Sequence, residues 1–386
     1  MVLSKDDQGY RQCSVTVMDN IADADIRFDK NGVCNYYHHY HELARRELPK
    51  ATEGVQRLDQ LLTYIKNNGK GKPYDCITGV SGGVDSSYLV YKAKEWGLRP
   101  LIVHFDNGWN SEIAVHNINK IIEKTGFDLY TIVVNWEEFR DLQLAYLKAG
   151  VVDLEVPTDH AIFATWYKLA EKYKVNTILD GNNIVTEAIL PPSWIFNKAD
   201  HINLLGIHKK FGTIPLKTYP LFGFKAKNIQ SFFGAVRPFK PLNLIDYNKQ
   251  AAKQTIQQEF EWIDYGGKHY ESVYTKFYQA YILPYKYKID KRKPHLSNLI
   301  LSGQITRKEA LAELALPLYQ PGEMETEKIY VLKKLGLSDL DFDCLMQLKP
   351  VAHEVYGKQK FLTEQYPMLK LLKPVARLLA KKKYQD

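Results

Sequence analysis

Apolar residues along the first half of the chain alternate between helical spacing and short continuous runs. Residues 55–67 show helical spacing and lead into a first apolar run that ends at Gly79. Further runs typical of buried strands occur at 100–105, 129–134 and 177–179, and segments with helix signals lie at 86–96, 111–125, 136–148 and 157–173. This alternation predicts an α/β fold built on a doubly wound parallel sheet with right-handed crossovers.

The chain on either side of this segment has a different pattern. Residues 10–41 carry few helix or strand signals, which predicts a small irregular N-terminal lobe. Residues 190–243 are rich in proline and aromatic side chains, which predicts an insertion that lines the substrate side of a ligand site; a packing layer or an oligomer contact is the alternative. We therefore divide the chain into a lobe with a lead-in helix, a central α/β domain that includes the insertion, and a helical C-terminal region, at 1–68, 69–245 and 246–386.

Helical spacing dominates the C-terminal region. It predicts helices at 250–263 and 269–283. Thr306 and Glu309 form the capping-box pattern of a further helix start. The charged stretch 290–297 is predicted to be a turn.

The segment Ser81-Gly82-Gly83-Val84-Asp85-Ser86-Ser87 joins the first apolar run to the helix that follows it. Its two glycines permit positive φ and a close approach of a ligand to the backbone, and its three serine hydroxyls lie beside N–H groups at a helix start. This composition predicts a phosphate site. Because a carboxylate repels bare phosphate, Asp85 indicates that a divalent cation accompanies the ligand.

Two common phosphate-loop motifs are excluded for this segment. No lysine follows Gly82 or Gly83 as a Walker A loop requires, and the glycines lack the dinucleotide-binding spacing. The segment instead resembles the Ser-Gly-Gly-x-Asp-Ser loop of the ATP pyrophosphatase (PP-loop) superfamily, with matches at Ser81, Gly82, Gly83, Asp85 and Ser86. The resemblance implies that the loop, with Ser87, binds ATP with Mg²⁺ and that ATP is cleaved between its α- and β-phosphates. An ordinary βα turn rich in small residues is the alternative interpretation.

Polar residues follow two more of the predicted strands. Ligands of doubly wound sheets bind beyond the carboxyl ends of the strands, so Asp106 to Trp109 and Asp180 to Glu187 are expected to open onto one crevice with the loop. The spacing from Gly181 to Glu187 resembles the second PP-loop signature, whose Glu holds magnesium. We assign ATP contacts to Asp106, Gly181 and Asn182, a shared Mg²⁺ to Asp85 and Glu187, and substrate contacts to Trp109, Asp159, His160 and Asn183. Helix capping alone would also explain Asp159.

Basic residues are nominated for the chemistry and the substrate. The run from Arg237 to Leu242 resembles the Arg-Pro-x-x-Pro-Leu run of several PP-loop enzymes, where a basic residue steadies the transferring adenylyl group. The resemblance implies a catalytic role for Arg237 and a substrate contact for Lys240. Lys217, as a catalytic residue, and His295, as a substrate contact, are nominated by position.

Four cysteines, Cys13, Cys34, Cys76 and Cys344, are too few and too scattered for a disulfide framework. The segments around Cys13 and Cys34 resemble the N-terminal metal module of N-acetyl sugar amidotransferases, in which two Cys-x-x-Cys pairs hold zinc. Thr16 and Tyr37 stand where the second cysteine of each pair would be, so a four-thiolate zinc site cannot form. The alternatives are a zinc site completed by His38, His39 or His41, and aromatic packing by Tyr36, Tyr37 and Tyr40 in place of the metal.

The cysteine lobe, the phosphate loop, both strand ends and residues 290–311 together resemble the N-acetyl sugar amidotransferases of bacterial surface-polysaccharide (O-antigen) synthesis. The resemblance implies that ATP adenylates an acetamido group of a nucleotide-linked sugar, a UDP-diacetamido uronic acid. Ammonia then replaces the oxygen to give an acetamidino group, with release of AMP and pyrophosphate. No cysteine stands in a nucleophile setting, so we expect a separate glutaminase subunit to supply the ammonia.

Composition and charge argue against a membrane protein, a secreted protein and a nucleic-acid-binding protein. No apolar run reaches the ~18 residues of a membrane span, and the first residues lack the apolar core of a signal peptide, so we expect a cytoplasmic protein without a membrane partner. The net charge of +8 is concentrated after Gly357 in a basic tail typical of a solvated helix face, so nucleic acid is not the expected partner. A tRNA-modifying PP-loop enzyme, which the tail would support, and a nucleotide-binding regulatory module are the alternatives.

Overall fold

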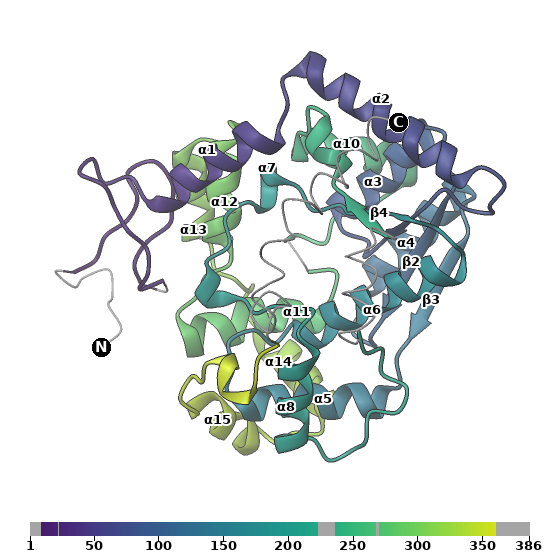
Figure 1. The fold of residues 1–386 in the computed structure, drawn as a ribbon. Coiled ribbons are helices and arrows are strands. Elements are labelled where there is room, and N and C mark those ends of the chain that lie inside the picture. Colours follow the sequence, from purple (N-terminus) through teal and green to yellow (C-terminus); the bar gives the residue numbers. More distant parts are fainter. Residues whose placement is uncertain (1–8, 22, 223–235, 268–269, 360–386) are drawn as a thin grey trace, which may run out of the picture.

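The computed structural model describes residues 9–21, 23–222, 236–267 and 270–359 and contains a five-stranded parallel sheet, seen at the right of Figure 1. The strand order is β3-β2-β1-β4-β5, and every pair is parallel. The strands are β1 (Cys76–Gly79), β2 (Pro100–Asp106), β3 (Leu129–Val133), β4 (Thr177–Leu179) and β5 (Arg237–Phe239). The predicted doubly wound α/β fold is confirmed.

Alternate residues of β1 point to opposite faces of the sheet, and each face has its own helices. Cys76 packs with Leu61 of α2 (Ala51–Gly69) and Leu89 of α3 (Val84–Glu95). On the same face, Ile102 of β2 packs with α4 (Glu112–Thr125) and α10 (Lys249–Phe260). Ile77 faces the other way, toward α6 (Val156–Lys172). The C-terminal α10 therefore completes the cover of the sheet.

Helix ends lie where capping residues predict them. Ser111 accepts the N–H of Ala114 at 3.1 Å at the start of α4, and Gly126 ends that helix with a φ of 70°. The predicted capping box of Thr306 and Glu309 is present at the start of α13 (Arg307–Ala315). The limits of these helices are therefore determined by local capping residues.

A second group of helices packs below the sheet in Figure 1 and shares the largest apolar core. It joins α5 (Trp136–Ala149) to the C-terminal elements, so part of the predicted central domain packs into the predicted C-terminal region. The other members are α8 (His201–Phe211), α11 (Val273–Phe277), η3 (Tyr278–Tyr287), α14 (Glu323–Leu335) and α15 (Asp339–Gln347).

Three local predictions are wrong. Residues 35–41 belong to α1 (Asn35–Glu47), and most of the predicted turn 290–297 belongs to α12 (Arg292–Leu301). The prolines of residues 190–243 favour irregular structure, but this segment contains α8 and the edge strand β5. In each case tertiary packing overrides weak local signals. The remaining short elements are α7 (Ile184–Glu187), η1 (Pro192–Trp194), η2 (Pro241–Leu244) and η4 (His353–Tyr356).

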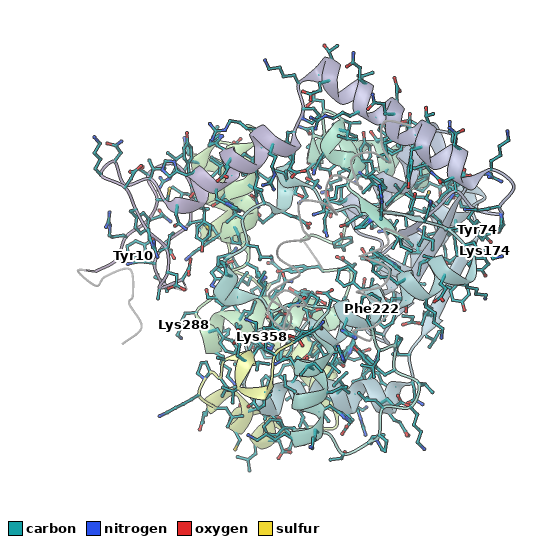
Figure 2. The ribbon with its side chains drawn as sticks, in the orientation of Figure 1. Tyr10, Tyr74, Lys174, Phe222, Lys288 and Lys358 are labelled. Carbon is teal, nitrogen blue, oxygen red and sulfur yellow. The ribbon has the colours of Figure 1, made fainter. Side chains whose placement is uncertain are left out.

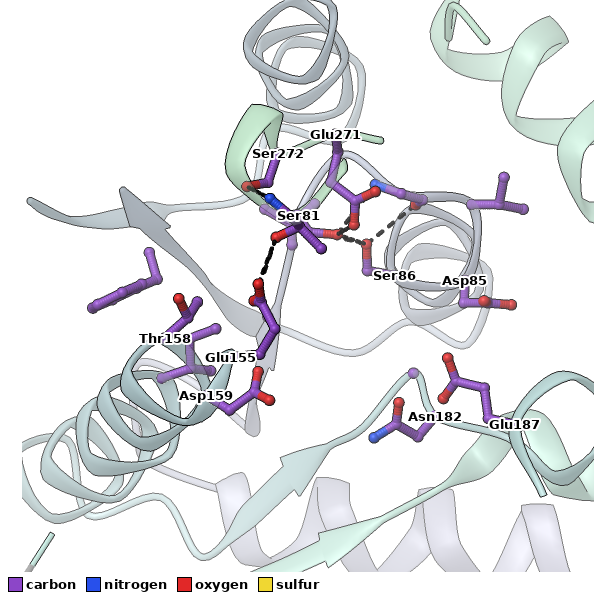
Figure 3. Close-up of a pocket in the computed structure, with 18 of the residues that line it drawn as sticks. Ser81, Asp85, Ser86, Glu155, Thr158, Asp159, Asn182, Glu187, Glu271 and Ser272 are labelled. Carbon is purple, nitrogen blue, oxygen red and sulfur yellow. Dashed lines mark hydrogen bonds between the residues drawn. The ribbon is translucent and has the colours of Figure 1, made fainter. Parts of the chain in front are cut away.

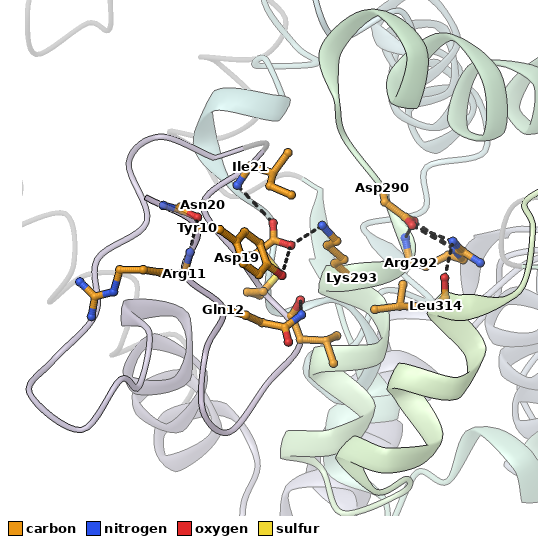
Figure 4. Close-up of polar contacts among 12 residues, drawn as sticks. Tyr10, Arg11, Gln12, Asp19, Asn20, Ile21, Asp290, Arg292, Lys293 and Leu314 are labelled. Atoms are coloured by element: carbon orange, nitrogen blue, oxygen red, sulfur yellow. Dashed lines mark hydrogen bonds and ion pairs between the residues drawn. The ribbon is translucent and has the colours of Figure 1, made fainter. Parts of the chain in front are cut away.

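The N-terminal lobe packs on α12 and α13 through polar and apolar contacts (Figures 1 and 4). Val17 packs with Leu296 and Ala310. The Lys293 ammonium of α12 pairs with the Asp19 carboxylate at 2.5 Å, and the Tyr10 hydroxyl donates to the same oxygen at 3.2 Å. Asp19 is 2% exposed, so this ion pair is almost completely removed from water.

Tyr74 and Lys174 lie at the amino edge of the sheet, where the Tyr74 ring contacts Tyr173 with ring centroids 5.2 Å apart (Figure 2). None of the helices in the described part of the chain has the length and apolar character needed to cross a membrane.

Candidate functional site

The phosphate loop lies between the carboxyl end of β1 and the first turn of α3. Ser86 Oγ accepts the N–H of Ser81 at 3.3 Å and donates to the Gly83 carbonyl at 3.1 Å. Ser81 Oγ accepts the N–H of Gly83 at 3.2 Å. These bonds fix the loop at the amino end of α3, where the backbone N–H groups favour an anion.

Glycine is needed at two loop positions for different reasons. Gly82 has a φ of 84°, and a Cβ there would lie 3.0 Å from the carbonyl oxygen of Ala114 in α4. Gly83 has an ordinary φ of −76°, but its Cβ would lie 3.3 Å from a Glu271 oxygen and 3.1 Å from Ser81 Oγ. The positive φ that glycine permits is adopted at Gly82 and not at Gly83, where a Cβ would instead crowd the ends of the Ser81 and Glu271 side chains.

A cavity of ≈ 470 Å³ opens beyond the carboxyl ends of β1 and β4. From β1 the chain adds β2 and β3 on one edge of that strand, and then returns to add β4 on its other edge. The order of the strands therefore reverses at β1, and the cavity lies at this topological switch point. The structure therefore brings the loop and the end of β4 to one cavity, as the strand-end rule predicts. The nominated residues that line it are Ser81, Gly83, Asp85, Ser86, Asp159, Gly181, Asn182, Glu187 and His295 (Figure 3).

Asp85 and Glu187 lie near each other at one end of the cavity (Figure 3). Asp85 Oδ1 accepts a hydrogen bond from Asn183 Nδ2 at 3.3 Å and another from the Tyr247 hydroxyl. Within the described residues, no three His, Cys, Asp or Glu side chains converge on a metal position. Mg²⁺ nevertheless commonly takes only one or two carboxylates and completes its shell with phosphate oxygens and water, so this donor set fits a Mg²⁺ ion shared with a phosphate ligand.

His104 of β2 lines the cavity and was missed from the sequence because its strand looks wholly apolar. Its Nδ1–H donates to the Val80 carbonyl at 3.1 Å, and its Nε2 accepts from Asn110 Nδ2 at 3.1 Å. Burial lowers the pKa of His104, which keeps the ring neutral. Asp106 accepts from the same Asn110 amide at 3.0 Å and is not part of the lining, so it orients a lining residue.

Glu271 contacts the phosphate loop from the segment before α11. Its carboxylate accepts the Ser81 hydroxyl at 3.2 Å (Figure 3). Trp262 in the same part of the chain donates its indole N–H to the Gly82 carbonyl at 2.8 Å. Glu271 could not be predicted as a site residue, because 190 positions separate it from Ser81 and no local motif surrounds it.

Two lysines of α10, Lys249 and Lys253, line a cavity whose other charged side chains are carboxylates. Lys253 pairs with Asp264, and Lys249 Nζ lies 2.8 Å from Nε2 of His295. Cations for an anionic ligand are thus concentrated at α10. The acidic lining residues are Asp85, Glu155, Asp159, Asp180, Glu187, Asp264, Glu271 and Glu313.

Several nominated residues do not line the cavity, among them Trp109, His160 and Lys217. Trp109 is fully buried and donates through Nε1 to Gln143 at 2.9 Å. His160 is also fully buried; it bonds the Lys198 carbonyl and accepts the N–H of Phe222, both at 2.9 Å. Lys217 is exposed and not part of the lining. The assignments of Trp109 and His160 to substrate and of Lys217 to catalysis are therefore corrected.

The strand register also corrects the role of Arg237. It pairs with Thr177, the first residue of β4, which places Arg237 at the amino edge of the sheet and the cavity at the opposite edge. Lys240 follows the carboxyl end of β5 but does not line the cavity. Burial raises the pKa of Asp180, and the positive charge of Lys240 partly offsets that effect. Lys240 therefore affects the cavity through its effect on the pKa of Asp180, which is one of the lining residues.

Ser87 and Asn183 stand behind the lining rather than in it. Ser87 is fully buried on α3. Asn183 accepts the N–H of Thr186 at 3.0 Å and so caps α7, while its amide nitrogen contacts Asp85. Asn183 is thus placed to position a carboxylate of the cavity.

The cysteine lobe does not fit zinc. Cys13 Sγ accepts the N–H of Thr16 at 3.4 Å and that of Cys34 at 3.2 Å, and the Thr16 hydroxyl lies 3.6 Å from Cys34 Sγ. His38 is bonded at the surface to Asp29 at 3.2 Å instead. In the described chain, no third ligand joins the two thiols, so this donor set falls short of the four that a structural zinc site takes.

Arg307 of α13 binds the segment around Cys13, which a zinc ion would bind in a lobe with all four cysteines. Its guanidinium donates to the carbonyls of Thr16 at 3.1 Å and Cys13 at 3.2 Å, and to the Gln12 side chain at 2.9 Å. Tyr36 and Tyr40 are buried beside these segments. Aromatic packing and the hydrogen bonds of Arg307 therefore both stabilise the lobe.

Comparisons with known proteins place the C-terminal part of the chain in a family context. Residues 271–373 match the family model described as "LPS biosynthesis protein WbpG-like, C-terminal domain", where LPS is lipopolysaccharide. This match bears out the resemblance to enzymes of bacterial surface-polysaccharide synthesis. A search among curated proteins finds no match.

Three solved structures match the chain at low sequence identity and low TM-score. An NH3-dependent NAD synthetase from Campylobacter jejuni is 10% identical, with a TM-score of 0.34, over 68% of this chain and 97% of the other. An NMN synthetase from Francisella tularensis is 13% identical, with a TM-score of 0.29, over 55% and 87%. A predicted tRNA methyltransferase subunit from Methanocaldococcus jannaschii is 11% identical, with a TM-score of 0.27, over 47% and 75%.

Proposed function

We propose that the protein is an ATP-dependent amidotransferase of lipopolysaccharide synthesis. It adenylates the acetamido oxygen of a nucleotide-linked N-acetyl sugar, and ammonia replaces that oxygen to give an acetamidino group. The observation that carries the proposal is that Asp85 and Glu187 line the same cavity as the phosphate loop. The WbpG-like match supports the pathway, and its first residue, Glu271, contacts the loop.

The residues of the loop suit the departure of pyrophosphate. The N–H groups at the start of α3 and the hydroxyls of Ser81 and Ser86 would hold the phosphates as charge moves onto them. Asp85 and Glu187 would hold Mg²⁺, which supplies charge neutralisation when bound. An amide oxygen is a poor leaving group until it is adenylated, so the protein needs to position reactants rather than provide a covalent nucleophile.

The proposal of a nucleotide-linked sugar as the substrate depends on the cationic side chains that line the cavity. Lys249 lies 2.8 Å from His295, and both line the cavity with Lys253. These side chains are suited to the diphosphate or carboxylate of a nucleotide-linked uronic acid. Because Lys249 lines the cavity and Arg237 does not, Lys249 replaces Arg237 as our candidate for steadying the transferring adenylyl group.

The test is incubation of the protein with ATP, Mg²⁺, ammonium and UDP-linked diacetamido uronic acids, followed by mass spectrometry. The expected products are AMP, pyrophosphate and a sugar whose mass falls by the difference between O and NH. Release of ADP and phosphate, or an unchanged sugar with every nucleotide sugar offered, would contradict the proposal. Asp128→Asn, which changes an exposed carboxylate that only bonds Tyr74, serves as the matched control for Asp85→Asn.

We also propose that a separate glutaminase subunit delivers the ammonia. The four cysteines give no candidate glutaminase nucleophile: Cys13, Cys34 and Cys76 are buried, and Cys344 is exposed on α15 outside the cavity lining. The purified chain should therefore use ammonium salts and not glutamine. Equal rates with the two nitrogen sources would refute this part of the proposal.

A further inference from the structure

Glu155, the residue before α6, lines the cavity together with the phosphate loop and was given no role in the proposed function. Its carboxyl and that of Asp159 lie beside each other in the cavity wall (Figure 3). Both oxygens of Glu155 lie 3.3 Å from the hydroxyl of Thr275 in α11. The carboxyl is therefore held in place from a second element, as a reacting group needs to be.

Charged groups from several elements surround Glu155. Asp159 of α6 and Asp153 of the preceding loop are negative, and Lys198 pairs with both of them, at 3.0 Å and 2.6 Å. Lys291, before α12, is a further cation near the cluster. Burial, followed by the charge of Asp159, raises the pKa of Glu155 to about 8, and Lys198 and the Thr275 hydroxyl offset only part of that rise. Tyr274 and Tyr278 face the same cluster as neutral phenols.

This environment suits one step of the proposed reaction. Ammonium is not a nucleophile, because its nitrogen has no free electron pair, so it must lose a proton before it attacks. Ammonium groups have pKa values of about 8 to 10, whereas an ordinary glutamate carboxylate, at about 4.3, is too weak a base to accept their proton efficiently. A general base works best when its pKa is near the working pH. A carboxyl such as Glu155 meets that condition.

We propose that Glu155 is the general base that converts ammonium to ammonia beside the adenylated sugar, an inference that rests on the proposed function. One N–H bond of ammonium breaks, the electron pair stays on nitrogen and the proton moves to a Glu155 oxygen. The ammonia lone pair forms the C–N bond at the activated carbon. The C–O bond to AMP then breaks, AMP leaves with the electron pair, and the nitrogen gives a second proton to water. Glu155 returns its proton to solvent after product release.

The test compares two nucleophiles in the Glu155→Gln variant. Glutamine has the shape of the protonated carboxyl, so the fold should be retained. Ammonium needs a base, whereas hydroxylamine is largely neutral near pH 7 and attacks without one. We expect the rate with ammonium at pH 7 to fall by about 10²- to 10⁴-fold, the range for loss of a general base. The rate with hydroxylamine should stay close to that of the wild type. Glu171→Gln, at an exposed position of the same helix, is the matched control.

The pH dependence gives a second readout that a merely structural role would not change. In the wild type, the ratio of the ammonium rate to the hydroxylamine rate should rise with ionisation of a group near pH 8. In Glu155→Gln, the ammonium rate should instead follow the concentration of free ammonia and recover at high pH. Equal losses with both nucleophiles, or an unchanged ammonium rate, would overturn the inference.

The outcome also separates this inference from the proposed function. ATP–pyrophosphate exchange in the presence of the nucleotide sugar should be intact in Glu155→Gln, because adenylation precedes ammonium. A wild-type protein that makes no acetamidino product overturns the proposed function and this inference with it. If the wild type makes the product and Glu155→Gln uses ammonium at the same rate as the wild type, only the inference about Glu155 is overturned.

Discussion

Asn183 Nδ2 donates to Asp85 Oδ1 at 3.3 Å, which joins the loop after β4 to the first turn of α3 across the switch point of the sheet. The Tyr247 hydroxyl donates to the same oxygen from the segment before α10. Two other parts of the chain thus hold Oδ1 of the Asp85 carboxylate, and a ligand would be bound through Oδ2. Such positioning in advance of binding is how a site stabilises charge without reorganising.

The first prediction concerns that carboxylate. Asp85→Asn keeps the shape of the side chain but removes the charge, so pyrophosphate release at saturating ATP should fall by about 10²- to 10³-fold, the cost of losing one charge-stabilising group. Tyr247→Phe keeps the carboxylate and should have a much smaller effect. A pyrophosphate assay over a range of Mg²⁺ concentrations distinguishes them. Full activity in Asp85→Asn would remove this residue from the ATP site.

The second prediction concerns the two demands on Gly82. Gly82→Ala should destabilise the protein by about 2 to 4 kcal/mol, since strain at positive φ adds to a close contact. Its Cβ would lie 3.0 Å from the Ala114 carbonyl oxygen. Gly126→Ala has a similar φ, 70°, but nothing within 4 Å, so it should cost only about 1 kcal/mol. Urea unfolding of both variants measures the difference, and equal losses would show that the close contact is unimportant.

A third prediction tests the ion pair under the N-terminal lobe (Figure 4). Lys293→Met leaves the buried Asp19 carboxylate without its cation and should destabilise the protein by about 3 to 5 kcal/mol. The double variant Asp19→Asn with Lys293→Met removes both charges and should recover a large part of that loss. Chemical denaturation of the two variants provides the measurement. A double variant no better than the single one would indicate that packing, not charge, is responsible.

Acid stability should depend on His353 in η4. Burial lowers the pKa of His353 to about 4, while its Nε2 accepts the N–H of Asp153 at 3.3 Å. The unfolded chain therefore binds this proton more tightly, so the stabilisation is complete above about pH 6.5 and is lost as pH falls toward 4. Between pH 7 and 5, the wild type should lose about 2 kcal/mol more unfolding free energy than His353→Gln. His39→Gln on the exposed side of α1 should follow the wild type, and parallel curves for all three proteins would exclude the effect.

The sheet and one side of the cavity were predictable because they depend on local patterns. Apolar runs and capping residues determine where β1 and β4 end, and parallel topology then brings Asp85 and Glu187 to one edge. The Gly82 φ and the capping box at Thr306 follow from the residue types themselves.

The rest of the site depends on packing that no short segment encodes. β5 is three residues long and contains Pro238, so its register, and with it the position of Arg237, could not be inferred from β-propensity. Trp109 follows a strand end, as a ligand contact would, yet it packs against Tyr274 and Trp136. Glu271 and Glu155 come from distant parts of the chain and line the same cavity, where Thr275 of α11 bonds Glu155.

Hydrogen bonds from the Arg307 guanidinium hold the N-terminal lobe without a metal ion, so its folding does not depend on the supply of metal in the cell. Three acceptors, from Gln12, Cys13 and Thr16, converge on this one side chain. A lobe closed by hydrogen bonds can fold during metal starvation and gives up no ion to competing chelators when it opens. The three hydrogen bonds nevertheless depend on one residue, and a change of Arg307 to lysine would remove the planar fork of donors while keeping the charge.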